Sequence, residues 1–133
     1  MRDCLIEANA NLCGAFETSR RADAVLAEAH LAMADFLNAE SPDEIVFGQN
    51  MTTLTLHISR SLGRTFKAGD EIVLSRMDHD ANVAPWLLLA EDLELTVRWF
   101  EFDTETFEFR LDDLAALLNE RTRLVCVGGA SNL

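Results

Sequence analysis

Short apolar segments with the character of buried strands recur along this chain at intervals of about 25 residues, and segments with helical spacing lie between them. Strands that alternate with helices in this way form right-handed βαβ units, so the sequence predicts an α/β fold with a mostly parallel sheet and flanking helices. The predicted strands cover residues 44–48, 71–75, 95–100 and 124–128, and the predicted helices between them cover residues 52–65, 81–91 and 111–119.

The first 40 residues have a different pattern. Apolar residues at steps of three and four predict one amphipathic, alanine-rich helix over residues 19–37, preceded by a polar loop at residues 9–14. We expect one partial domain over residues 1–133, in which residues 1–40 form a loop and a helix and residues 41–133 form the first βαβ units. The last predicted strand lacks the helix that normally covers a parallel strand, so we expect a fragment of a longer protein.

The formal net charge of −12 limits the partners of this chain. A surface with 23 acidic and 11 basic residues repels nucleic-acid phosphates and anionic membranes, so neither is expected as a partner. Three widely spaced cysteines, Cys4, Cys13 and Cys126, indicate neither a disulfide framework nor a zinc site. With no signal peptide or apolar span in the sequence, a cytoplasmic location is expected.

Polar or small residues follow three of the predicted strands, where parallel sheets bind their ligands. The first such cluster, residues 48–53, contains Met51, Thr52 and Thr53 at a turn from strand to helix. Free N–H groups and hydroxyls at such a turn can hold a phosphate. The alternative is that the two threonines only cap the helix.

The second cluster, residues 77–82, places His79 between Asp78 and Asp80. A histidine there can stack on a flat ring or move a proton, because its ordinary pKa lies near physiological pH. The alternative is a loop histidine, with Asp80 or Asn82 capping the next helix. A metal site is not predicted, because no further ligands are visible.

The third cluster, residues 128–132, combines small residues that permit close approach of a ligand with the polar side chain of Asn132. A plain turn at the end of a strand is the alternative. Cys126, within the preceding predicted strand, is expected to be a buried and inert thiol.

Taken in this order, the three clusters resemble the class V aminotransferase family, and in particular its cysteine desulfurase-like branch. The resemblance is most specific at residues 69–73, which match a Gly-Asp-Glu strand, and at residues 77–86, which match a Glu-His-His-Ala-Asn-x-x-Pro-Trp segment. Residues 120–125 and the Ser131-Asn132 pair match further parts of the family's sequence pattern.

The resemblance implies pyridoxal 5'-phosphate (PLP) as cofactor, bound in the large domain of a fold-type-I PLP-dependent transferase. His79 then corresponds to the histidine that stacks on the pyridine ring and assists proton transfer. Met51 and Thr52 fall on the phosphate-binding pair, and Asn132 on the asparagine that bonds the ring hydroxyl. An amino-acid substrate and a homodimer in the full-length protein are implied as well.

The chain also departs from the family pattern. Met51 replaces a hydroxyl-bearing residue, and Asp80 stands where many members have a second histidine. The Schiff-base lysine lies beyond Asn132 in family order, and Lys67, the only lysine here, sits in a distant turn. We therefore expect this fragment alone to be catalytically inactive. The alternative is a degenerate, non-catalytic α/β module that binds or assembles; a nucleotide-binding domain is disfavoured because no GxGxxG or GxxxxGK[ST] loop occurs.

Overall fold

The computed structural model describes residues 2–130 and divides the chain into two compact units, Met1–Phe47 and Gly48–Leu133. Each unit is described by itself. That residues 1–133 form a single partial domain stays a prediction.

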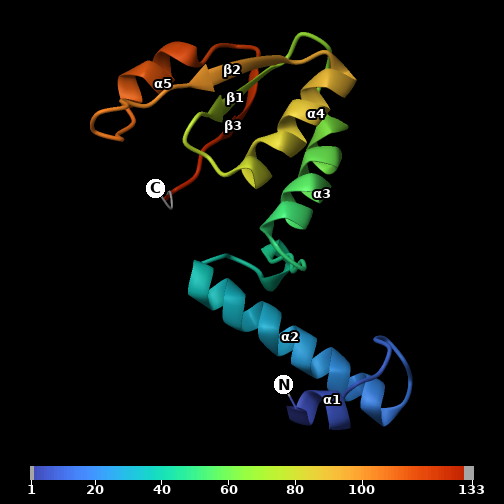
Figure 1. Ribbon diagram of the computed structural model, residues 1–133. Coiled ribbons are helices and arrows are strands. Elements are labelled where there is room, and N and C mark those ends of the chain that lie inside the picture. Colours follow the sequence, from blue (N-terminus) through green and yellow to red (C-terminus); the bar gives the residue numbers. More distant parts are fainter. Residues whose placement is uncertain (1, 131–133) are drawn as a thin grey trace. The chain divides into compact units, whose positions relative to one another are not determined.

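The first unit consists of two helices, labelled α1 and α2 in Figure 1, and a short 3-10 turn. Helix α1 spans Arg2–Glu7 and was not predicted; none of its residues is buried. Helix α2 spans Glu17–Leu37, as the apolar spacing predicts, and ends where Asn38 adopts a left-handed conformation with φ of 55°. That conformation lets the Asn38 N–H bond the last helical carbonyls.

The predicted strand at residues 44–48 is wrong. Residues Pro42–Glu44 form the 3-10 turn η1, closed by a reciprocal capping box between Ser41 and Glu44. The following residues up to Gly48 have no regular secondary structure and pair with no strand among the described residues, and Val46 is 76% exposed. An apolar run becomes a strand only when a neighbouring strand receives its backbone hydrogen bonds.

The second unit is the predicted α/β structure. Its elements in chain order are α3 (Met51–Gly63), β1 (Glu71–Ser75), the 3-10 turn η2 (Asp80–Asn82), α4 (Ala84–Leu93), β2 (Thr96–Phe100), α5 (Leu111–Leu117) and β3 (Thr122–Cys126). The three strands form a parallel sheet in the order β2-β1-β3. All five residues of β1 are buried because this strand is central. The α/β fold with a parallel sheet and flanking helices is therefore confirmed.

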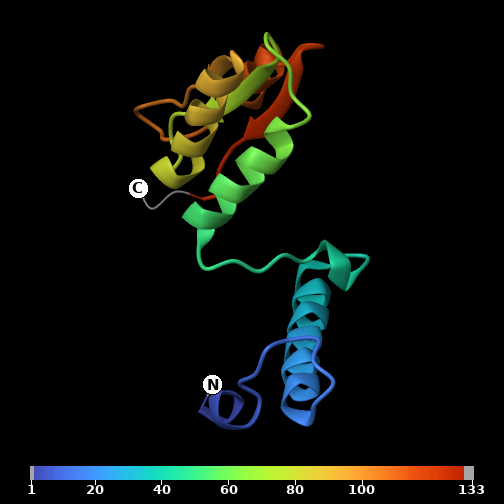
Figure 2. The same cartoon turned by 90° about the vertical axis from the view of Figure 1, so that its right-hand side faces the viewer.

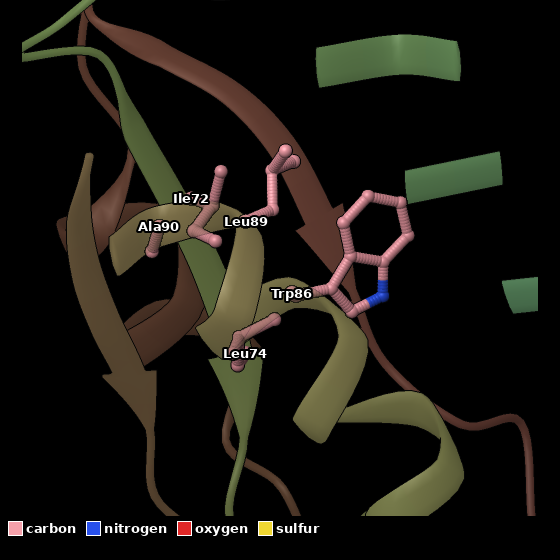
Figure 3. Close-up of a cluster of buried hydrophobic side chains, with 5 residues drawn as sticks. All are labelled: Ile72, Leu74, Trp86, Leu89 and Ala90. Carbon is pink, nitrogen blue, oxygen red and sulfur yellow. The ribbon is translucent and has the colours of Figure 1, made fainter. Parts of the chain in front are cut away.

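The core lies between β1 and α4. Ile72 and Leu74 point from the strand toward Trp86, Leu89 and Ala90 of the helix, as Figure 3 shows. Helix α3 packs against α4 and approaches closely at Gly63, where an added Cβ would lie 2.5 Å from Leu89 Cδ1. The other side of the sheet carries α5, which contacts β2 (Figure 1). Figure 2 shows α3 alongside the same sheet in a second view.

Alternate residues of β1 point to the other face of the sheet, away from α4. Glu71 is 1% exposed there and is ion-paired with Arg98 of β2 and with Arg121 beside β3. Asn119 donates a further hydrogen bond to Glu71 at 2.8 Å. The Gly-Asp-Glu segment thus fastens the amino ends of the three strands to one another.

The described part of the chain has no helix that is both long and apolar enough to cross a membrane. Within the same residues, His, Cys, Asp and Glu side chains form no group of three suited to a metal ion.

Candidate functional site

A cavity of about 760 Å³ lies at the carboxyl ends of β1 and β3, beside the first turn of α3. This volume is within the range of small-molecule sites. Three segments that are far apart in the sequence line it, and they correspond to the three predicted clusters: Asn50 to Thr52, Met77 to Asn82, and Gly128 to Ala130. The parallel topology brings them together because β1 and β3 are neighbours and end at the same edge of the sheet.

The first wall of the cavity is the N-terminus of α3. Asn50 is the N-cap, and its Oδ1 accepts hydrogen bonds from the N–H of Thr53 at 2.9 Å and from the Thr53 hydroxyl at 3.1 Å. The N–H groups of Met51 and Thr52 have no hydrogen-bond partner among the described residues. Capping therefore engages Thr53, and the first two N–H groups of the helix with the side chain of Thr52 stay available at the cavity.

The second wall carries His79. Its Nδ1 accepts a hydrogen bond from the Ala81 N–H at 3.0 Å, so His79 itself is the N-cap of η2. A neutral ring that accepts at Nδ1 carries its proton on Nε2. The predicted alternative, in which Asp80 or Asn82 caps the next helix through its side chain, does not describe this turn. His79 is exposed at the cavity, and its Nε2 is the atom that can meet a ligand.

The third wall is the turn after β3. A Cβ on Gly129 would find no heavy atom within 4 Å, so this position faces open space. A Cβ on Gly128 would instead lie 2.7 Å from Oδ1 of Asp78, so the absence of a side chain there makes room for that carboxylate. The predicted site residue Asn132 lies outside the described residues.

A group of hydrogen-bonded side chains joins the second and third walls, and the sequence did not predict it. It is centred on the half-buried Asp78, whose Oδ2 accepts from the Ser75 hydroxyl and from the Gly128 N–H at 3.0 Å. Its Oδ1 accepts from Asn82 Nδ2 at 2.9 Å. The Cys126 thiol donates to Asn82 Oδ1 at 3.0 Å. Polar residues just after a strand are a signal for such groups, but no spacing rule pairs Asp78 with Gly128.

Cys126 is half-buried, and burial raises the pKa of its thiol above the ordinary value. A thiol that stays protonated is a poor nucleophile, which agrees with the expected inert role. The nearby indole Nε1 of Trp86 is buried and has no hydrogen-bond partner among the described residues.

Lys67 is far from this cavity along β1. It precedes the strand, in a turn closed by a hydrogen bond from the Lys67 N–H to Asp70 Oδ2 at 2.9 Å, whereas the cavity follows the strand. The single lysine of this chain therefore does not reach the cavity.

The sequence profile of the family described as aminotransferase class-V matches residues 1–133. The chain belongs to the class V aminotransferase family. Family members are PLP-dependent. Among curated relatives, the cysteine desulfurase of Dickeya dadantii (strain 3937) is 40% identical over 121 residues, which cover 90% of this chain and 29% of that protein. This member of the class V family thus spans less than a third of the length of that relative.

Solved structures show the same likeness. The apo structure of cysteine desulfurase from Thermococcus onnurineus NA1 superposes with a TM-score of 0.89 at 30% identity, covering 98% of this chain and 32% of that one. A C-DES variant with glycine covalently linked to its PLP cofactor gives a TM-score of 0.67 at 27% identity, covering 85% and 29%. The class V fold seen here is therefore part of a fold-type-I PLP enzyme fold.

The cavity fits PLP in its chemistry. A phosphate needs hydrogen-bond donors, which the free N–H groups of Met51 and Thr52 supply at a helix N-terminus. A flat ring needs a planar partner and open space, which His79 and Gly129 provide. The cavity also lacks a lysine from this chain, so these residues fit noncovalent binding.

Proposed function

We propose that this chain supplies one part of the PLP-binding site of a cysteine desulfurase-like or selenocysteine lyase-like enzyme that acts on an amino acid. The observation that carries the proposal is the cavity in which the start of α3, the His79 turn and the glycine turn after β3 meet. The proposal also rests on the names of the relatives, which are cysteine desulfurases. A cytoplasmic location and a homodimeric full-length protein belong to the same proposal.

In this proposal the first turn of α3 receives the phosphate. The N–H groups of Met51 and Thr52 and the hydroxyl of Thr52 are the donors, and the helix dipole adds attraction for the negative charge. The side chain of Met51 contributes no hydrogen bond, so the backbone carries more of the phosphate contact. Asn132 remains the proposed partner of the ring hydroxyl.

His79 is the proposed catalytic residue. Because Ala81 holds its Nδ1, the imidazole plane is fixed by the chain and Nε2 is free to hold or release a proton. The ring would stack on the pyridine ring. PLP, when bound, supplies the electron sink that makes bonds at the amino-acid α-carbon labile.

Without a lysine at the cavity, the 133-residue chain is proposed to bind the cofactor weakly and to be inactive by itself. The binding test therefore uses pyridoxine 5'-phosphate, which has no aldehyde and so cannot attach to Lys67 or the N-terminus. Calorimetric titration with this compound and with pyridoxine should show tighter binding of the phosphorylated form. Equal affinity for both, or binding of neither, would contradict the phosphate site.

Two variants with matched controls locate the site. Thr52→Val should weaken binding of pyridoxine 5'-phosphate, whereas Thr106→Val, which removes an exposed hydroxyl in a distant loop, should not. His79→Ala should weaken binding of both compounds because the stacking partner is lost, and the exposed His57 on α3 serves as control in His57→Ala. If the controls weaken binding as much as the site variants do, the cavity is not the site.

A further inference from the structure

The carboxylate of Asp78 lies beneath the cavity and joins its second wall to its third. It follows β1 and accepts the N–H of Gly128, which follows β3, at 3.0 Å. Those two residues are separated by fifty positions in the sequence. No other side chain among the described residues hydrogen-bonds the glycine turn at Gly128. Asp78 is therefore the polar link between the turn that carries His79 and the turn that carries Gly129.

Three donors converge on this one carboxylate. The Ser75 hydroxyl and the Gly128 N–H meet Oδ2, and Asn82 Nδ2 meets Oδ1. Ionised carboxylates only accept hydrogen bonds, and bonds to a charged acceptor are roughly twice as strong as neutral ones. The arrangement therefore fits the charged form of Asp78.

Asn82 is held in the orientation that serves Asp78. Its Oδ1 accepts the Cys126 thiol at 3.0 Å, and this leaves Nδ2 to face the carboxylate. The thiol stays protonated because burial raises the pKa of Cys126. The chain of contacts thus runs from Cys126 at the end of β3 through Asn82 to Asp78, and from Asp78 to Gly128 in the turn after β3.

From this geometry we propose that Asp78 is a positioning residue: its carboxylate holds the His79 turn and the Gly128 turn at the distance that a cofactor between them requires. We assign its effect on the ligand to the placement of these two turns, which it joins at the wall of the cavity. The inference rests on the proposed function only for the identity of the ligand. The tie between the two turns exists in the chain without ligand.

The decisive variant is Asp78→Ala, which removes both carboxylate oxygens and with them the acceptor of the Gly128 N–H. An asparagine would be less informative, because its amide oxygen can still accept from Gly128 while its NH₂ faces Asn82. The matched control is Asp80→Ala, because Asp80 is an exposed carboxylate in the same segment. Asp78→Glu keeps a charged acceptor and serves as the conservative rescue.

The first measurement is amide hydrogen exchange by NMR on the 133-residue chain without ligand. Asp78→Ala should speed exchange at Gly128 while the amides of β1 stay as slow as in the wild type, and Asp78→Glu should retain slow exchange. Asp80→Ala should change neither. Unchanged exchange at Gly128 would overturn the inference, because it would show that the contact with Asp78 does not protect this amide. Equal acceleration throughout β1 would also overturn it, because Asp78 would then stabilise the fold in general.

The second measurement is affinity for pyridoxine 5'-phosphate, which should fall about tenfold in Asp78→Ala and stay close to the wild-type value in Asp78→Glu. Gly128→Ala is an independent probe, since its Cβ would lie 2.7 Å from Asp78 Oδ1 and displace the carboxylate. It should speed exchange of the residue-128 amide as Asp78→Ala does, and slow exchange there would count against the inference. A wild-type chain that binds no pyridoxine 5'-phosphate overturns the proposed function, and the exchange data then decide on Asp78 separately.

Discussion

Arg98 of β2 donates from its Nε to Oε2 of Glu71 at 2.6 Å, which joins two neighbouring strands across the face opposite to α4. Arg98 is partly exposed, whereas the side chain of Glu71 is 1% exposed. Glu71 is the first residue of β1, so the Glu71 carboxylate supports the sheet near the end opposite to the candidate site. The amino end of β1 thus carries the ion pair that joins the strands, and its carboxyl end borders the candidate site.

The Glu71 network predicts acid sensitivity of the fold. The hydrogen bond from Arg98, with a second from Asn119, lowers the pKa of Glu71 from 4.5 to about 2. A carboxyl whose pKa is lower in the folded state stabilises the fold above its unfolded pKa and loses that contribution as the pH falls toward the folded value. We expect the midpoint of thermal unfolding to fall between pH 4.5 and about 2.

Glu71→Gln separates this contribution from other acids. The variant should unfold at lower temperature than the wild type at pH 7, and its stability should depend less on pH across the same acid range. Thermal unfolding followed by circular dichroism at several pH values measures both effects. Parallel pH curves for the two proteins would contradict the assignment to Glu71.

The core between β1 and α4 predicts a large effect of truncation at Leu89. This side chain is 3% exposed and fills the space that Gly63 leaves on α3. Leu89→Ala should lower the free energy of unfolding by about 2–5 kcal/mol, because it removes buried methyl groups and leaves a cavity. Its neighbour Leu88 is 49% exposed, and Leu88→Ala should change stability by about 0.5 kcal/mol or less. Urea unfolding compares the two, and similar losses would contradict this description of the core.

Substitution by alanine should affect stability differently at two glycines. Gly69 has φ of 84°, a left-handed conformation that costs a residue with a Cβ about 1–2 kcal/mol, although nothing crowds the site. Gly129 has open space around it and needs no left-handed backbone. Gly69→Ala should therefore lower the midpoint of urea unfolding, and Gly129→Ala should leave it close to the wild-type value. The reverse order would contradict the left-handed conformation of Gly69, because neither position is crowded.

The sequence by itself determined the α/β class, the helices α2 to α5 and the three strands of the sheet, because apolar spacing reports directly which faces of a segment are buried. It also singled out Met51, Thr52 and His79, and the structure gathers these three around one cavity, although no strand precedes Met51 as predicted. The family resemblance rested on the same segments. These are local properties, because each depends on the types and spacing of a few neighbouring residues.

Tertiary structure decided what depends on a distant partner. The apolar run at residues 44–48 is not a strand, because no strand among the described residues pairs with it. The contact of Asp78 with Gly128 joins positions that only the neighbouring placement of β1 and β3 brings together. The burial of Glu71 against Arg98 likewise follows from strand register. A hydrogen bond or ion pair between strands has no signature in local spacing, since its partner is selected by how the strands align.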